Sequence, residues 1–563
     1  MLFNSIEYLL FLPIVFAIYW LLRKHLKLQN AFVVLASYVF YGWWDWRFLI
    51  LIAFTSLCSY ASGLLIQKSQ ITNDQSPIAK LWLELNIVLN LGILAVFKYY
   101  DFFVSEFGAL FGISTESLLL RIILPVGISF YTFQALSYSI DVYRGNIKPT
   151  RDIIAFFAFI SFFPQLVAGP IERATNLLPQ FLQKRTFSYG QGVDGMRQIL
   201  WGLFKKIVVA DNCAMYVDQV WATCDTQSGS TLLLAAILFT FQIYGDFSGY
   251  SDIAIGTAKL FGIKLMRNFN NPYFSRDIAE FWRRWHISLT SWFRDYVYIP
   301  LGGSRPTIAD SWFLGKTKTQ INPVPEINNE NIIVNQKSGD SVCCEQHSSS
   351  ISADSVIVSE LPLQNHPLSS NSVSEDTESS PYKNEDLQSS TKNPKNAENC
   401  SWKKWVIVRN TFVIFLLSGI WHGANWTYLV WGLYNVLLFL PLILLGKSKR
   451  YKDAPLVWKQ LPQMLLTFVL VTIGWIIFRA PSLSDAWGYV CSTTNMTGGS
   501  PTLPITQWIG IIFGLLTMIA FEWTYRNSNH APIPHRWWIY YILIAGIWWY
   551  APSFSTDFIY FQF

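Results

Sequence analysis

The chain has 563 residues, of which 52% are hydrophobic and 17% aromatic, while only 14% carry a charge. Soluble domains carry roughly 25% charged residues, so this composition, with a mean hydropathy of +0.29, excludes an ordinary soluble protein. The formal net charge of +6 does not indicate a nucleic-acid partner, because basic residues in membrane proteins chiefly set the orientation of the chain.

Apolar runs close to the ~20 residues needed to span a bilayer recur along the chain. They include residues 7–22, 48–66, 81–103, 405–420, 425–445, 465–478, 509–521 and 537–549. About ten to twelve spans are expected, which predicts an all-α polytopic membrane protein. The first run lacks a preceding basic stretch and a following cleavage site, which is typical of a retained helix and not of a signal peptide.

Acidic residues interrupt the apolar stretch FQIYGDFSGYSDIAIG at residues 241–256, where Asp246 follows a glycine. Ionisable groups inside a membrane protein are costly and are usually functional. The glycines indicate a broken or re-entrant helix. Asp246 either contributes to substrate binding, for example by orienting a histidine, or simply pairs with an arginine, and both interpretations stay open.

Residues 276–303, RDIAEFWRRWHISLTSWFRDYVYIPLGG, predict an amphipathic helix with an aromatic stripe. The stripe includes Trp285, and His286 lies at its border. This helix either lies in the membrane interface or tucks into the protein. Basic residues outnumber acidic ones here, which favours either attraction to anionic lipid or an entrance for a phosphate-bearing donor bound by Arg283, Arg284 and Arg294.

Residues 304–401 are rich in Ser, Asn, Glu and Asp and have no helical period. Such a composition cannot bury enough apolar surface to offset the loss of chain entropy. It predicts a disordered polar insertion between an N-terminal membrane part, residues 1–303, and a C-terminal membrane part, residues 402–563. The insertion is either a regulatory adaptor or a tolerated, solvated loop.

The motif SGIWHGANW, residues 418–426, lies at the end of an apolar run. Basic loops at residues 23–27, 403–404 and 447–452 favour a non-cytoplasmic N-terminus and make residues 405–445 a hairpin with this motif near its turn. Seventeen residues of helix from Trp405 rise ~26 Å. His422 is therefore expected deep in the protein, toward the far side of the membrane.

An imidazole at this depth suits general base catalysis, because its ordinary pKa lies near neutral pH. The alternative is a buried, hydrogen-bonded structural histidine. Gly423 and Asn425 after His422 favour irregular backbone lining a cavity. The seven cysteines are scattered without a CxxC pair, so neither a metal site nor a disulfide framework is expected.

Five motifs occur in order along the chain, namely PVGISFYTFQALSYSIDVYRG, FFPQLVAGPIER, YGDFSGYSDIAIG, NFNNPYFSRDIAEFWRRWHISLTSWFRDYVYIPLGG and LLSGIWHGANWTYLVWGLYNV. Together they closely resemble the membrane-bound O-acyltransferases, in the branch of the bacterial alginate O-acetyltransferases. The stretch GWIIFRAPSLSDAW near the C-terminus also resembles that branch. The resemblance covers nearly the whole chain apart from the insertion, which departs from the usual pattern.

The resemblance implies a ring of tilted helices around a thin centre, where a cytoplasmic tunnel and an outer funnel meet near a histidine. The family histidine matches His422 in WHG, and a second family histidine matches His286 in WRRWHIS. By this resemblance, acetyl-CoA donates the acetyl group and no cofactor is bound. The acetyl group passes to a periplasmic SGNH-like partner that acetylates a polysaccharide.

We therefore expect a multi-pass O-acetyltransferase of a bacterial inner membrane. His422 acts as general base, and His286 assists donor binding or proton handling. Substrate binding is assigned to the residues singled out above, Arg283, Arg284, Arg294, Trp285, Asp246 and Asn425.

Three functions are alternatives to acetylation of an exopolysaccharide. The same fold acylates other envelope polymers, such as peptidoglycan, or exports D-alanyl groups to teichoic acid; the tail after Gly474 argues against the D-alanyl case, since that branch is shorter. A small-solute transporter predicts internal repeats, and the sequence shows no clear repeat.

Overall fold

The structure is a computed structural model that describes residues 1–71, 76–303, 394–452, 454–494, 498–527, 536–552 and 558–559. Within these ranges the regular secondary structure is helical, apart from one isolated bridge between Gln227 and Gly499. The all-α prediction is therefore confirmed for the described part of the chain. Residues 304–393, most of the predicted polar insertion, lie outside the described residues.

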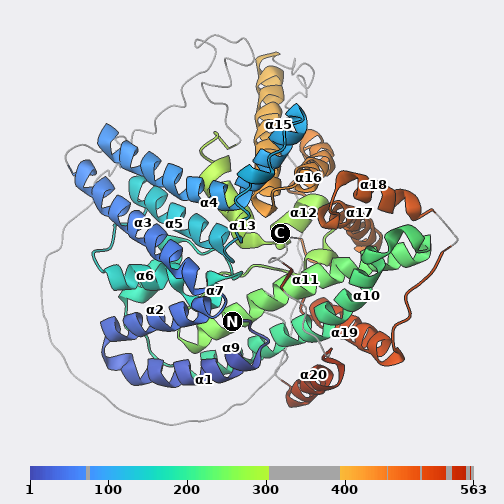
Figure 1. Ribbon diagram of the computed structural model, residues 1–563, viewed down its shortest axis with the longest axis horizontal. Helices are drawn as coiled ribbons and strands as arrows, with labels where there is room; N and C mark the ends of the chain where they lie inside the picture. Colours follow the sequence, from blue (N-terminus) through green and yellow to red (C-terminus); the bar gives the residue numbers. More distant parts are fainter. Residues whose placement is uncertain are drawn as a thin grey trace, which may run out of the picture. The chain divides into compact units, whose positions relative to one another are not determined.

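The described residues up to 303 form thirteen α-helices, most of which are labelled in Figure 1. They are α1 Ile6–Leu21, α2 Leu26–Gly42, α3 Leu49–Gln70, α4 Pro77–Phe111, α5 Ile128–Tyr143, α6 Ile153–Ser161, α7 Phe163–Leu166, α8 Ala174–Leu182, α9 Tyr189–Phe204, α10 Asp211–Ala222, α11 Gly229–Leu260, α12 Ile278–Arg284 and α13 Ile287–Phe293. Two π-helical turns, η4 Lys205–Ala210 and η7 Arg294–Tyr298, follow α9 and α13.

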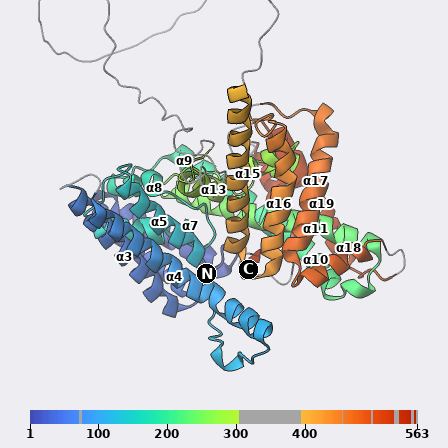
Figure 2. The same ribbon diagram turned by 90° about the horizontal axis from the view of Figure 1, so that it is seen from above.

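The C-terminal part begins with the long helix α15 (Figure 2). Its helices are α15 Pro394–His422, α16 Trp426–Leu444, α17 Leu461–Arg479, α18 Leu483–Ser492, α19 Ile505–Thr524 and α20 Trp537–Tyr550. Short 3-10 turns occur at Leu22–Lys24, Trp46–Phe48, Glu116–Leu118, Cys224–Thr226, Pro272–Phe274 and Trp458–Gln460.

Eight helical segments of the described chain are long and apolar enough to cross a membrane. They are Ile6–Lys24, Trp46–Gln70, Pro77–Phe111, Gly229–Leu260, Lys404–His422, Trp426–Leu444, Trp458–Arg479 and Ile505–Thr524. The apolar run at residues 537–549 forms α20, which at 14 residues is shorter than the ~20 residues of a full span. The protein is a multi-pass membrane protein.

Helix α11 forms the centre of the core and packs against α7, α9, α10, α17 and α18 (Figure 1). In its most apolar window 78% of residues are buried, against 11% for the window of α4. α11 is thus surrounded by protein, whereas α4 exposes most of its apolar surface, as expected of a helix that faces lipid.

The single amphipathic helix expected over residues 276–303 is wrong. The segment is divided into α12, α13 and η7, because His286 adopts a left-handed backbone conformation with φ 44°. The aromatic side chains Phe281, Trp285 and Trp292 are almost fully buried. The sequence left open whether this segment lies in the membrane interface or inside the protein, and the structure places it inside the protein.

Candidate functional site

The WHG motif lies at the turn between two helices, as the sequence predicts. α15 ends at His422, and α16 begins at Trp426, where the Asn425 side chain accepts a hydrogen bond from the N–H of Thr427 at 3.0 Å. A Cβ atom on Gly423 would lie 2.2 Å from a ring carbon of Tyr428, so the turn requires glycine. This turn fixes where the imidazole of His422 points.

His422 is enclosed by aromatic rings. Its ring centroid lies 4.9 Å from Trp421, 5.2 Å from Trp431 and 5.1 Å from Phe478, each in an edge-on arrangement. The residue is only 6% exposed. Such packing restricts the imidazole to one orientation, which is what a group that reacts with a positioned substrate requires.

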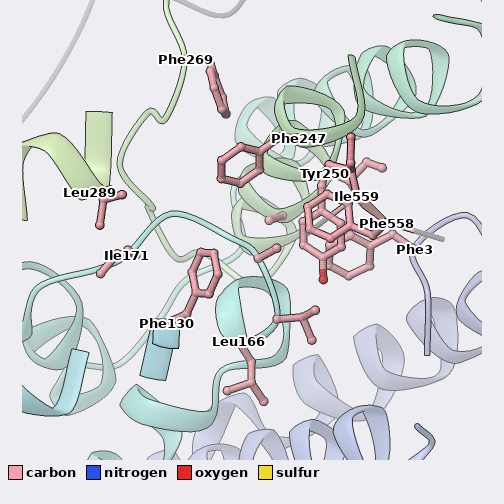
Figure 3. Packing of buried hydrophobic residues seen from close by; sticks show 14 of the residues in the cluster. Phe3, Phe130, Leu166, Ile171, Phe247, Tyr250, Phe269, Leu289, Phe558 and Ile559 are labelled. Atoms are coloured by element: carbon pink, nitrogen blue, oxygen red, sulfur yellow. The ribbon is translucent and has the colours of Figure 1, made fainter. Parts of the chain in front are cut away.

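His286 joins α12 to α13 and is 1% exposed. Its ring lies 4.7 Å from Phe247 and 5.8 Å from Trp421, centroid to centroid. Phe130 and Phe269 flank it at 6.5 Å, and both appear with Phe247 in Figure 3. The two sequence-predicted histidines therefore meet across one side chain, the indole of Trp421.

Asn268 holds the backbone around His286. Its carbonyl accepts from the N–H of Ile287 at 2.8 Å, and its side-chain oxygen accepts from the N–H of Ser288 at 3.3 Å and from the hydroxyl of Ser288 at 2.9 Å. These contacts satisfy the first donors of α13, which no residue within α13 can reach. The break at His286 is thus imposed by a loop eighteen residues upstream.

A cavity of about 50 Å³ reaches His422 from the side of α4 and α5. Its wall comprises Lys98, Leu124, Pro125, Val126, Gly127, Ile128, Ser129, Phe130, Trp421 and His422. The Lys98 ammonium donates to the carbonyls of Trp421 at 2.7 Å and His422 at 2.9 Å. His422 is therefore a buried residue that also lines a cavity, which is what a reactive group needs.

A second, polar cavity of about 170 Å³ lies between α9, α11, α19 and the loop before α12. It is lined by Gln198, Trp201, Lys205, Tyr244, Ser248, Ser251, Asp252, Ile255, Lys259, Leu265, Arg267, Asn268, Phe269, Asn271 and Glu522. Lys205 donates to Asp252 at 2.5 Å and to Ser248 at 2.8 Å. Since Phe269 and Asn268 also contact the His286 segment, this cavity approaches the histidine pair from another side.

The three arginines expected to bind donor phosphates make separate contacts. Arg284 pairs with Glu280 at 3.0 Å, and Arg283 donates to the carbonyl of Ser448 at 2.8 Å. Arg294 pairs with the adjacent Asp295 at 2.7 Å, and 64% of its side chain is exposed. The structure does not gather them into one cluster.

Three further candidates take part in packing. Trp285 is 2% exposed and stacks on Phe281 at 5.5 Å. Asp246 pairs with Lys206 at 2.7 Å and accepts from the N–H of Ile559 at 2.6 Å. The sequence left open a histidine or an arginine as the partner of this carboxylate, and the structure shows a lysine instead. Asn425 caps α16, as described above, and its amide donates to the carbonyl of Pro481 at 2.8 Å.

Sequence reasoning missed Lys98, Lys205 and Glu522. Each lies in an otherwise apolar run, as in ILAVFKYYDFF around Lys98. An ionisable residue in such a run is by default a functional hypothesis. That signal was present in the sequence, but it does not say which distant segment the charged group contacts.

Comparison with known proteins decides the family. Residues 35–313 match the model of MBOAT, the membrane-bound O-acyltransferase family. A probable alginate O-acetylase AlgI of Azotobacter vinelandii is 33% identical over 491 residues, 86% of this chain and 77% of that protein. The chain belongs to the membrane-bound O-acyltransferase family. A probable alginate O-acetylase AlgI of Pseudomonas aeruginosa is 34% identical over 86% of this chain and 74% of that protein.

The membrane-bound O-acyltransferase assignment extends beyond these two relatives. A peptidoglycan O-acetyltransferase of Helicobacter pylori is 29% identical over 534 residues, 89% of this chain and 81% of that protein. The family resemblance drawn from the motifs is thereby confirmed, and the protein is an acyltransferase. The chemical roles of His422 and His286 stay predictions.

Proposed function

We propose that the protein is an O-acetyltransferase of a bacterial inner membrane that supplies acetyl groups to an extracellular polysaccharide such as alginate. The observation that carries this proposal is the placement of His422 on a cavity wall, with His286 on the other side of Trp421. The names of the two AlgI relatives, alginate O-acetylases, support the choice of reaction and acceptor.

The polar cavity is the proposed route of the acyl donor, acetyl-CoA. Lys259 and Arg267 line it, and guanidinium and ammonium groups suit phosphate groups. Arg294, the most exposed of the three arginines before the insertion, contributes to phosphate binding at the surface together with Arg283 and Arg284. The thioester end would then approach His286, which assists in placing the donor.

The loop charges support an orientation with the N-terminus in the periplasm. In that orientation Lys403 and Lys404, in the N-terminal part of α15, lie toward the cytoplasm, and the His422 end of α15 lies toward the periplasm. Lys264 follows α11 on the cytoplasmic side. The polar cavity then faces the donor compartment, and the cavity lined by Lys98 faces the acceptor compartment.

His422 would act as the general base. A neutral imidazole takes the proton of an attacking hydroxyl and returns it to the leaving thiolate. The acceptor hydroxyl belongs either to the polysaccharide or to a periplasmic SGNH-like acetyltransferase that passes the acetyl group on. Trp421, Trp431 and Phe478 hold the ring and exclude bulk water, which limits hydrolysis of the thioester.

Peptidoglycan is a second candidate acceptor. It is favoured by the Helicobacter pylori peptidoglycan O-acetyltransferase, which aligns with 89% of this chain. The two candidates differ only in the acceptor, so the same chemistry at His422 serves either. Offering each polymer with labelled donor separates them.

The proposal is tested with a His422→Ala variant. The full-length protein is placed in proteoliposomes with radiolabelled acetyl-CoA, and transfer to the acceptor polymer is measured with and without a periplasmic extract. Loss of the base should lower transfer by about 10²–10⁴-fold. The matched control is His25→Ala, since His25 is exposed at the turn between α1 and α2. Equal transfer by the His422→Ala protein would overturn the proposal.

A further inference from the structure

Lys98 is a charged residue inside the spanning helix α4. Its ammonium donates to the carbonyls of Trp421 and His422, at the C-terminal end of α15, where helix carbonyls lack helical partners. A lysine ammonium has three N–H donors, so these contacts fix its position and use two of them. The side chain lies on the wall of the cavity that His422 also lines.

Ser129 lies on the same wall, in the first turn of the 16-residue helix α5. The residue is only 6% exposed, and no hydrogen bond joins its hydroxyl to another protein group within the described part of the chain. The hydroxyl of a nearly buried serine that has no protein partner and borders a cavity is placed to bind something in the cavity. The N-terminus of α5 adds the positive end of a helix dipole at the same wall.

Lysine ammonium, serine hydroxyl and helix N-terminus share one property, since each stabilises negative charge. Gathered around a cavity of about 50 Å³ that His422 also lines, they make a small site for one oxygen anion. We propose that Lys98 and Ser129 bind the oxyanion of the tetrahedral intermediate when the acyl group is transferred at His422. This inference rests on the proposed function and assigns two further catalytic residues to it.

The proposed acyl transfer takes place by attack and then collapse of a tetrahedral intermediate. The acceptor oxygen attacks the carbonyl carbon of the acyl thioester and forms a C–O bond, while its proton passes to His422. The carbonyl electron pair moves onto oxygen, which accepts from the third N–H of Lys98 and from the Ser129 hydroxyl. Collapse restores the carbonyl and breaks the C–S bond, and the thiolate takes the proton from His422.

The contacts of Lys98 explain why its placement suits this step. The two carbonyls that anchor it belong to the residue pair that carries the base, so the ammonium and the imidazole keep a constant separation. A donor held in place before the reaction needs no reorganisation when charge develops, which is the source of most oxyanion stabilisation.

The test compares Lys98→Met, Lys98→Arg and Ser129→Ala in the full-length protein, with acetyl-CoA as donor. Lys98→Met should lower kcat by about 10²–10³-fold, and Ser129→Ala by about 10-fold. The KM for acetyl-CoA should stay within about two-fold, because the oxyanion exists only in the transition state. Lys98→Arg, which keeps the charge and N–H donors, should recover part of the lost kcat.

Matched controls lie on the same two helices. Lys80 pairs with Glu84 on the exposed face of α4, and Ser137 donates to the carbonyl of Gln134 within α5. Lys80→Met and Ser137→Ala should keep kcat. Ser129→Ala breaks no hydrogen bond within the described part of the chain, so it tests the inference even if Lys98→Met fails to fold.

The outcomes separate this inference from the proposed function. If Lys98→Met and Ser129→Ala retain kcat while His422→Ala loses it, the oxyanion site is wrong and the proposed function stands. A raised KM with unchanged kcat also overturns the inference, since it indicates ground-state binding. If His422→Ala retains transfer, the proposed function itself fails.

Discussion

At the residue scale, buried ion pairs around Glu280 hold Arg276 and Arg284 in fixed positions. Arg276 binds both carboxylate oxygens of Glu280, at 2.8 and 2.9 Å, and Arg284 binds one at 3.0 Å. Arg276 also donates to the carbonyls of Ala454 and Pro455, each at 2.9 Å. The cluster thus fixes α12, and with it the His286 turn, to the segment before α17.

The pKa of Glu280 records the same balance. Burial raises the pKa, but the hydrogen bonds from Arg276 and the charge of Arg284 lower it by more. The pKa of Glu280 therefore lies below its ordinary value. A depressed pKa means that the ionised carboxylate stabilises the folded state above the unfolded pKa of about 4.3. This contribution is lost as pH falls through the folded pKa.

We predict that Glu280→Gln lowers the free energy of unfolding by about 3–5 kcal/mol at pH 7, because two buried guanidinium groups lose their counter-charge. Thermal unfolding in detergent between pH 7 and 3 measures the effect. The wild-type protein should lose stability only below about pH 4, and the variant should lack that acid step. Glu84→Gln, in the exposed pair with Lys80, is the control and should change stability by less than about 1 kcal/mol. An unchanged variant would show that the cluster adds no stability.

At the element scale, the glycines at residues 241–256 wrongly predicted a broken or re-entrant helix, since α11 runs unbroken from Gly229 to Leu260. Hydropathy and motifs predicted other membrane-spanning helices and the turn at WHGANW. They failed at residues 276–303, where the 3.6-residue period continues through His286 although the helix does not. The period reports which side chains are buried, and those are indeed buried. The break depends on Asn268, and a contact between separate segments leaves no trace in local periodicity.

The candidate site shows the same division. The two histidines were predicted from their motifs, whereas Lys98 was not, because its partners lie more than three hundred residues away. The carboxylate of Asp246 was found from its apolar context, but its partner Lys206 became visible only in the fold. The sequence thus identifies the chemical groups, whereas only the packing of the helices shows which groups pair.

The contact between α9 and α11 depends on glycines that face each other. A Cβ atom on Gly202 would lie 2.6 Å from the carbonyl oxygen of Gly249, and one on Gly256 would lie 2.5 Å from that of Gly195. Real Cβ atoms do not approach backbone this closely, so the helices touch because the side chains are missing. The approach positions Lys205 and Asp252 on the wall of the polar cavity.

We predict that Gly202→Ala destabilises the protein by about 1–3 kcal/mol, because the helices must separate to admit the methyl group. Gly190→Ala is the control on the same helix, since a Cβ there has open space. It should leave the unfolding midpoint unchanged or raise it, because alanine has the higher helix propensity. Thermal unfolding of both variants in the same detergent measures the difference in midpoint, and equal midpoints would contradict the close packing.

At the scale of the whole molecule, the membrane parts on either side of the insertion pack into one compact unit, residues 1–307 and 400–563. Contacts join them at several places. Asn212 donates to the carbonyl of Tyr550 at 2.8 Å, and Asp246 accepts from Ile559. His286 and His422 come from different parts, so the candidate site exists only when both are folded together.

The two chain segments that border the insertion are also tied to each other. Asn410 donates to the carbonyl of Gly303 at 2.8 Å, and Arg409 donates to that of Leu301 at 2.9 Å. Residues 301–303 end the first part, and α15 carries the two donors into the second. The membrane unit therefore holds its own ends in place without help from the residues between them.

We predict that the acyltransferase tolerates replacement of residues 308–399 by a Gly/Ser linker of about ten residues, which reaches up to ~33 Å when extended. That length suffices, because α15 rises only ~15 Å from residue 400 to Asn410. Shortening a loop of roughly ninety residues to about ten removes about 2 kcal/mol of closure entropy, so the unfolding midpoint should stay or rise. Acetyl transfer in proteoliposomes is measured beside a variant with a scrambled insertion of full length. If both variants fold but lose transfer, the insertion sequence makes a specific contact that the reaction needs, and the membrane unit is not sufficient.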